Sequence, residues 1–206
     1  MTMRNPEALI PAQAEGSQKD FEYEYTCRSA EEAKQYFQRC KDRLMDINNW
    51  HNIGGAPSAI FKITDNYGKE LHIKATIGQY IKIDVPGPGP AASGGNDWVQ
   101  IEHVISGKLN DDEEYAAIRV RPSAAPDKPG ATIMHFFSDK ATSTFILKRM
   151  GNVISIQYAG RNEVANKEAD VLIDHVRNTV VATTARMGFS DVQWKSLVKG
   201  IIGLHQ

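Results

Sequence analysis

The chain has 206 residues, of which 41% are hydrophobic and 24% charged, enough for one sizeable core and short for two. Its 24 Lys and Arg residues nearly balance 25 Asp and Glu residues, so the net charge of −1 lacks the basic excess that nucleic-acid binding needs. The sequence contains no apolar run of about 18 residues and no secretory signal pattern. We therefore expect no nucleic-acid partner, no membrane span and a cytoplasmic location.

The first part of the chain predicts a leader, one strand and one helix. Residues 1–20 carry scattered prolines without a hydrophobic period, so we expect a disordered leader over 1–20 and a single domain over 21–206. Apolar and polar residues alternate over 21–27, which predicts a half-buried strand. Ser29 and Glu32 have the spacing of a capping box, so a helix is expected to begin there.

The middle of the chain reads as a long run of strands. After residue 57 the hydrophobic period becomes two, which is typical of strands. The predicted strands cover residues 58–64, 70–85, 97–106, 115–121, 131–137, 143–149 and 153–158. Their connections are too short for parallel crossovers, so neighbouring strands are expected to be mostly antiparallel.

Two helices are predicted after the strands. Residues 164–187 repeat apolar side chains on one side at helical spacing and predict a helix about 36 Å long. Its apolar side holds small and β-branched residues and no aromatic one, which would leave room for a cavity against a sheet. A short terminal helix is expected to follow a capping box at Ser190, with Trp194, Leu197, Val198 and Ile201 on its apolar side.

The order of these elements resembles that of the START-like superfamily, also called helix-grip or SRPBCC. The resemblance covers residues 21–188, and Asn49-Trp50-His51 is similar to the position where many relatives carry a tryptophan. It implies an α+β fold in which a curved antiparallel β-sheet wraps around a long C-terminal α-helix and leaves a pocket between them. It also implies a hydrophobic or amphipathic ligand, with no metal or nucleotide cofactor. The chain departs by having one or two more strands and the extra short terminal helix.

The residues nominated for ligand binding are polar and aromatic side chains that such a pocket could bring together. They are Trp50, Trp98, His103, Arg119, His135, Tyr158 and His175. Histidines facing inward would form a polar spot in an apolar pocket, and arginines can clamp a carboxylate with two hydrogen bonds. Each nomination has a plain alternative: separate histidines, an outward row formed by Arg119 and Arg121, and aromatic residues that only fill the core.

Motifs for other chemistry are weak. The histidines lack the close spacing of a metal site, so no metal is expected. The glycine-rich stretch over 86–95 lacks the lysine and the following helix of a phosphate loop. Cys27 and Cys40 fall on apolar faces and are expected to be buried free thiols. Glu102 and Glu163 are available for acid–base chemistry but are expected to face solvent.

Three functions remain open at this point. The leading one is a small-molecule binding protein without enzymatic activity, whose cavity lies between the sheet and the long helix. The second is a cyclase- or dehydratase-like enzyme that uses a pocket histidine as acid or base. The third is an interaction module with a filled pocket, which would form a homo-oligomer through an exposed apolar patch on the terminal helix.

Overall fold

The computed structural model describes residues 5–55, 59–84, 96–128, 133, 135–166 and 191–204. The helical elements in the first part of the chain are η1 (Pro6–Leu9), α1 (Ala30–Met45), η2 (Ile47–Asn49) and α2 (Trp50–Ile53). The strands are β1 (Ser17–Thr26), β2 (Ile60–Thr64), β3 (Tyr80–Asp84), β4 (Asp97–Lys108), β5 (Glu113–Pro122), β6 (Thr142–Met150) and β7 (Val153–Glu163). A further helix over 191–201, here called the terminal helix, follows near the end of the chain.

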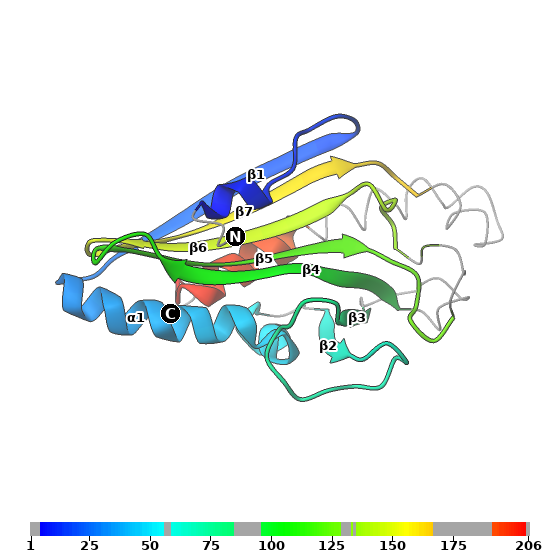
Figure 1. Ribbon diagram of the computed structural model, residues 1–206, viewed down its shortest axis with the longest axis horizontal. Coiled ribbons are helices and arrows are strands. Elements are labelled where there is room, and N and C mark those ends of the chain that lie inside the picture. The colour runs from blue at the N-terminus through cyan, green and yellow to red at the C-terminus, as the bar shows by residue number, and fades with distance from the viewer. Residues whose placement is uncertain are drawn as a thin grey trace.

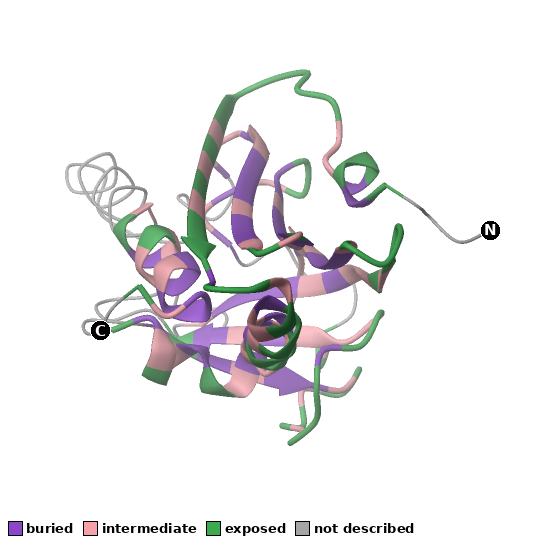
Figure 2. Ribbon diagram, turned by 90° about the vertical axis from the view of Figure 1, so that its left-hand side faces the viewer, coloured by how far each residue is buried: buried purple, intermediate pink, exposed green. Residues whose placement is uncertain are grey.

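The seven strands form one sheet in the order β1-β7-β6-β5-β4-β3-β2, and every neighbouring pair is antiparallel. The sheet is curved, with α1 and the terminal helix inside the curve (Figures 1 and 2). The expected α+β class, with an antiparallel sheet around a C-terminal helix, is therefore confirmed. The described helix inside the sheet is the terminal helix. Residues 167–190 of the predicted long helix lie outside the described residues.

Three predicted boundaries need correction. In the described part of the strand predicted over 70–85, the continuous strand is 80–84, and Glu70 forms an isolated bridge with Thr64. Gly78, with φ +87°, interrupts the extended backbone between them. In the described part of 131–137 there is only a single bridge, between Phe137 and Ala165. Residues 164–166 are not helical, so the long helix does not begin at Val164.

The described part of the leader is ordered, which contradicts the expected disorder at the N-terminus. Residues 17–20 already belong to β1, and Leu9 is 1% exposed because it packs on the outer face of the sheet against Ala117 and Ile146. Glu7 reaches Lys148 at 2.6 Å on that face. The backbone amide of Ala14 donates to Asn162 Oδ1 at 2.8 Å. Leu9 thus supplies an apolar anchor that the search for periodicity missed.

The main core joins α1, the inner face of the sheet and the terminal helix. Its buried members include Phe37, Leu44, Phe61, Phe145, Ile156, Leu197, Val198, Ile201 and Ile202. Burial of Leu197, Val198 and Ile201 inside the chain contradicts the exposed apolar patch that the interaction module requires. Within the described ranges, no helix has both the length and the apolar character needed to cross a bilayer.

The end of the terminal helix is fixed by a Schellman motif. The amide of Leu204 donates to the carbonyl of Lys199 at 2.9 Å, and that of Gly203 to Gly200 at 3.1 Å. Gly203 has φ +73°, a conformation that glycine adopts without steric cost. From α1, the Tyr36 hydroxyl donates to the carbonyl of Ile202 at 2.9 Å. This hydrogen bond joins α1 to the end of the terminal helix.

Candidate functional site

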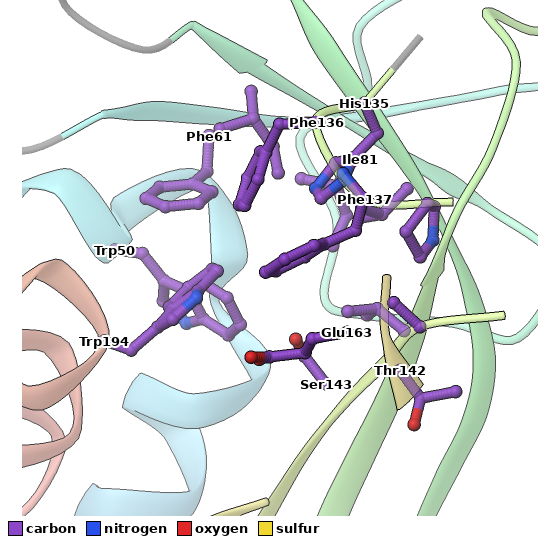
Figure 3. Close-up of a pocket in the computed structure, with 15 residues that line it drawn as sticks. Trp50, Phe61, Ile81, His135, Phe136, Phe137, Thr142, Ser143, Glu163 and Trp194 are labelled. Atoms are coloured by element: carbon purple, nitrogen blue, oxygen red, sulfur yellow. The ribbon is translucent and has the colours of Figure 1, made fainter. Parts of the chain in front are cut away.

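A cavity lies between the inner face of the sheet, α2 and the terminal helix (Figure 3). One wall consists of Trp50, Phe61 and Trp194, which come from α2, β2 and the terminal helix. Phe136 and Phe137 face this wall from the segment before β6. The volume is about 30 Å³, room for a water molecule or two and far below the several hundred Å³ typical of ligand sites. The structure therefore shows a nearly closed cavity with aromatic walls.

The first wall is rigid because its rings pack on one another. Trp50 lies 5.5 Å from Phe61 and 6.4 Å from Trp194 between ring centroids, both in edge-to-face geometry. The indole nitrogen of Trp50 donates to the carbonyl of Leu44 at 3.1 Å, which fixes the ring relative to α1. Trp50 is 1% exposed. This wall holds the shape of the cavity in place.

The opposite wall depends on hydrogen bonds between two non-strand segments. The Phe136 and Phe137 rings lie 4.2 Å apart, and His135 stacks on Phe136 at 4.5 Å. His135 Nδ1 accepts from the amide of Phe137 at 3.0 Å, so a neutral ring carries its proton on Nε2. Asn166 Nδ2 donates to the carbonyls of Ile133 and His135 at 2.8 and 3.1 Å. These hydrogen bonds, and not a strand of the sheet, hold Phe136 and Phe137 over the cavity.

Glu163 brings a buried carboxyl group to this apolar cavity. Its side chain is 3% exposed, and in Figure 3 it points toward Trp194. Burial raises the pKa of Glu163, although Lys19 Nζ at 3.6 Å and a hydrogen bond from Ser17 Oγ at 3.1 Å act in the opposite direction. The expectation that Glu163 faces solvent is therefore wrong.

Tyr158 lies behind the cavity wall and connects to it through Ser143. The Tyr158 hydroxyl and Ser143 Oγ are 3.0 Å apart, and Ser143 lines the cavity. Burial is the main reason why the pKa of Tyr158 lies above its ordinary value, and the negative charge of Glu163 adds to this effect. The Tyr158 ring stacks on Trp194 with a centroid distance of 6.0 Å. Tyr158 thus supports the aromatic wall from the sheet.

A curved antiparallel sheet that encloses a helix, with a cavity between them, is the arrangement that defines the helix-grip fold. The chain has the helix-grip fold. No protein-family model and no curated protein sequence matches it. Similar solved structures include a norcoclaurine synthase from Thalictrum flavum, with 12% identity, coverage of 94% of this chain and 100% of that one, and a TM-score of 0.36.

Two further solved structures have the same level of similarity to this helix-grip protein. A major latex-like protein from Panax ginseng has 8% identity, coverage of 92% of this chain and 99% of that one, and a TM-score of 0.44. A protein from Arthrobacter aurescens has 11% identity, coverage of 90% and 86%, and a TM-score of 0.43. Because these identities and TM-scores are low, the function proposed below depends on this chain's own residues.

Only part of the predicted ligand-binding set meets at the helix-grip cavity. Trp50 and His135 line it, and Tyr158 lies directly behind it. Trp98 belongs to a separate small cluster with Ala125. His175 lies outside the described residues.

His103 and Arg119 lie opposite each other on β4 and β5, on the outer face of the sheet. Arg119 Nε contacts Glu102 at 2.8 Å, and Arg121 Nε contacts the other carboxylate oxygen at 2.5 Å. Burial raises the pKa of Glu102, but these two arginines outweigh it and hold the pKa below its ordinary value. The arginines therefore clamp a carboxylate of the chain itself, away from the cavity.

The two cysteines are buried, and the described residues form no cluster of metal ligands. Cys27 and Cys40 are free and buried, and burial raises the pKa of the Cys40 thiol to about 12, so the reactive thiolate is scarce. In the part of the chain that the structure describes, no group of three or more His, Cys, Asp or Glu side chains is placed to hold a metal ion.

The ligand-binding residues predicted from the sequence did not include Phe136, Phe137, Ser143 or Trp194, all of which line the cavity. Trp194 carried a usable signal, because it begins the apolar side of the terminal helix. Phe136 and Phe137 were assigned to a strand, where neighbouring side chains would point to opposite faces. In the structure both line the cavity, because their segment is irregular.

Proposed function

We propose that this helix-grip protein binds a small, largely apolar molecule in the cavity between the sheet and the terminal helix. The observation that carries the proposal is the placement of aromatic side chains from four separate parts of the chain around one hollow. Trp50, Phe61, Phe137 and Trp194 offer large apolar faces to an occupant. Two buried free thiols accord with a reducing compartment such as the cytoplasm.

Binding requires the cavity to enlarge. The sheet side is held by continuous ladders of hydrogen bonds, whereas the wall over 135–138 is held by a few separate ones. These include the amide of Ser138 to Val164 at 2.9 Å and the amide of Asn166 to Phe136 at 2.9 Å. Because fewer bonds must break there, we expect Phe136 and Phe137 to move aside when a ligand enters.

The first experiment is native mass spectrometry of the protein purified from its own host, followed by denaturing extraction of any bound molecule. We expect a carried apolar compound. Ala141→Leu adds side-chain volume at a buried position on the cavity wall, so this variant should no longer carry the compound. Val192→Ala on the exposed side of the terminal helix is the matched control and should retain it. Recovery of nothing from repeated gentle preparations, with no binding of apolar probes, would end the proposal.

A second candidate function is acid–base catalysis in the same cavity. It is favoured by Glu163, a buried carboxyl group on the cavity wall whose pKa burial raises above its ordinary value, which favours the protonated form that a general acid needs. His135 lines the cavity as well and is the one histidine of the predicted set that does so within the described residues. Chemical change of the extracted compound on incubation, lost in Glu163→Gln, would favour this function over binding alone.

A further inference from the structure

Charges beside the cavity do not balance. Lys19 Nζ lies 2.5 Å from Asp191 and 3.6 Å from Glu163, so one cation serves two carboxylates. The nearby Arg161 is already paired with Asp20 at 2.8 Å. Counting Lys19, Glu163 and Asp191 as charged leaves this group with one uncompensated negative charge. Since Lys19 sits closer to Asp191, the deficit falls on Glu163, whose side chain is only 3% exposed.

The side of Glu163 that faces the cavity is surrounded by aromatic rings. Trp50, Trp194 and Phe137 line the same hollow, and the carboxyl end of Glu163 points toward Trp194 (Figure 3). The faces of aromatic rings attract cations, with tryptophan the most effective. A positive group in this hollow would meet both a buried carboxylate and the faces of indole rings.

A second polar group at the cavity lacks a partner. Thr142 lines the hollow and is 2% exposed, and within the described residues its Oγ1 has no hydrogen-bond partner. A buried hydroxyl without a partner costs free energy that an occupant with a polar group can recover. A purely hydrocarbon ligand would leave Glu163 uncompensated.

We propose that the cavity selects an aromatic compound carrying a protonated amine, with the ammonium group against Glu163 and the aromatic body between Trp194 and Phe137. The proposal rests on the proposed function, because it names the class of molecule that the cavity takes. The ammonium supplies the positive charge missing beside Lys19 and donates charge-assisted hydrogen bonds to the carboxylate.

A proton on Glu163 would compete with such a cation for the carboxylate. Burial raises the pKa of this carboxyl, with Lys19 opposing and Asp191 reinforcing the shift. The other titratable groups close by are Tyr158 on the sheet and His135 on the opposite wall. Because the proton and the ammonium compete for one carboxylate, the affinity for an amine should rise with pH through the pKa of Glu163.

The test compares two probes of nearly equal shape, benzylamine and benzyl alcohol, by calorimetric titration of the full chain at pH 8 and pH 5. At pH 8 we expect wild type to bind benzylamine about ten-fold more tightly, since one good charge-assisted contact is worth about that much. At pH 5 the preference should be smaller than at pH 8, because the raised pKa of Glu163 lets protons compete more strongly for the carboxylate at the lower pH. Glu163→Gln should remove this preference at pH 8, and binding of benzyl alcohol that can still be measured in the variant shows that the cavity is intact.

Glu24→Gln is the matched control, because it removes an exposed carboxylate from β1 and should keep the preference. Equal affinity of wild type for both probes, or a preference that survives in Glu163→Gln, would overturn the amine proposal and leave the binding function standing. Failure of both probes, and of larger apolar ones, would overturn the binding function itself. The two proposals can therefore fail separately.

Discussion

Trp194→Ala is the sharpest test of how the terminal helix is held. The Trp194 ring lies 5.4 Å from Phe145, 5.8 Å from Phe61 and 6.0 Å from Tyr158 between centroids, so it bridges helix and sheet. Removal of a fully buried aromatic side chain costs about 3–5 kcal/mol. Trp194 is half-buried, so we expect the free energy of unfolding to fall by about 3 kcal/mol, at the lower end of that range.

The assay is equilibrium unfolding in urea, followed by far-ultraviolet circular dichroism. Val192→Ala on the same helix is the control: Val192 is 69% exposed, so its removal should change stability by less than about 0.5 kcal/mol. Trp194→Phe should fall between the two variants, because it keeps a ring against Phe145. If Trp194→Ala lost no more than Val192→Ala, the terminal helix would not lie inside the sheet, and the cavity would lose one wall.

Three further predictions follow from single contacts. Gly203→Ala places a side chain in the left-handed conformation and against the Tyr36 hydroxyl, so the free energy of unfolding in urea should fall by about 1–2 kcal/mol. Gly151→Ala is the control: it has the same left-handed backbone but open space around it, so it should lose only the free energy of the backbone strain. Leu9→Ala should lower stability by about 2 kcal/mol, because the side chain is buried on the outer face, and a loss near zero would mean that the leader is detached. The free energy of unfolding of Glu163→Gln, measured relative to wild type, should be higher at pH 8 than at pH 4. The pKa of Glu163 is raised in the folded protein, so the protonated carboxyl stabilises the fold below about pH 4.5, and this stabilisation is lost as the pH rises through the folded pKa. Urea midpoints that moved in parallel at the two pH values would refute this assignment.

Regular patterns allowed most of the sheet to be predicted. The strands now labelled β4, β5, β6 and β7 were found from their alternating pattern, although parts of β5, β6 and β7 are buried on both faces. The helix cap at Ser29 was predicted correctly, and its hydroxyl accepts from the amide of Glu32 at 3.1 Å. Alternation failed over 70–79, where apolar residues lie beside irregular backbone.

The cavity was harder to predict, and Glu163 explains why. Along β7 the even-numbered residues Ile154, Ile156 and Tyr158 belong to the inner core, so parity places residue 163 outside. Asn162 breaks this parity with φ 55°, and the pairing with β1 gains an extra residue between Gly160 and Glu163. The bulge turns the carboxyl group inward. A left-handed asparagine leaves no reliable mark in a single sequence, so the most polar residue of the cavity could not be assigned from alternation.

The same bulge connects the fold to the proposed chemistry. A buried carboxyl group without a cationic partner on a regular strand would occupy a core position and lower stability. Here the bulge places Glu163 at the end of β7, between Ser17 on β1 and the beginning of the terminal helix, where Lys19 and Asp191 meet. Gly160 accommodates it, since a Cβ there would overlap Glu163 Oε1. The bulge and Gly160 thus place Glu163 beside the aromatic walls, where it must share the positive charge of Lys19 with Asp191. A cationic aromatic ligand would supply the missing positive charge and pack against the rings.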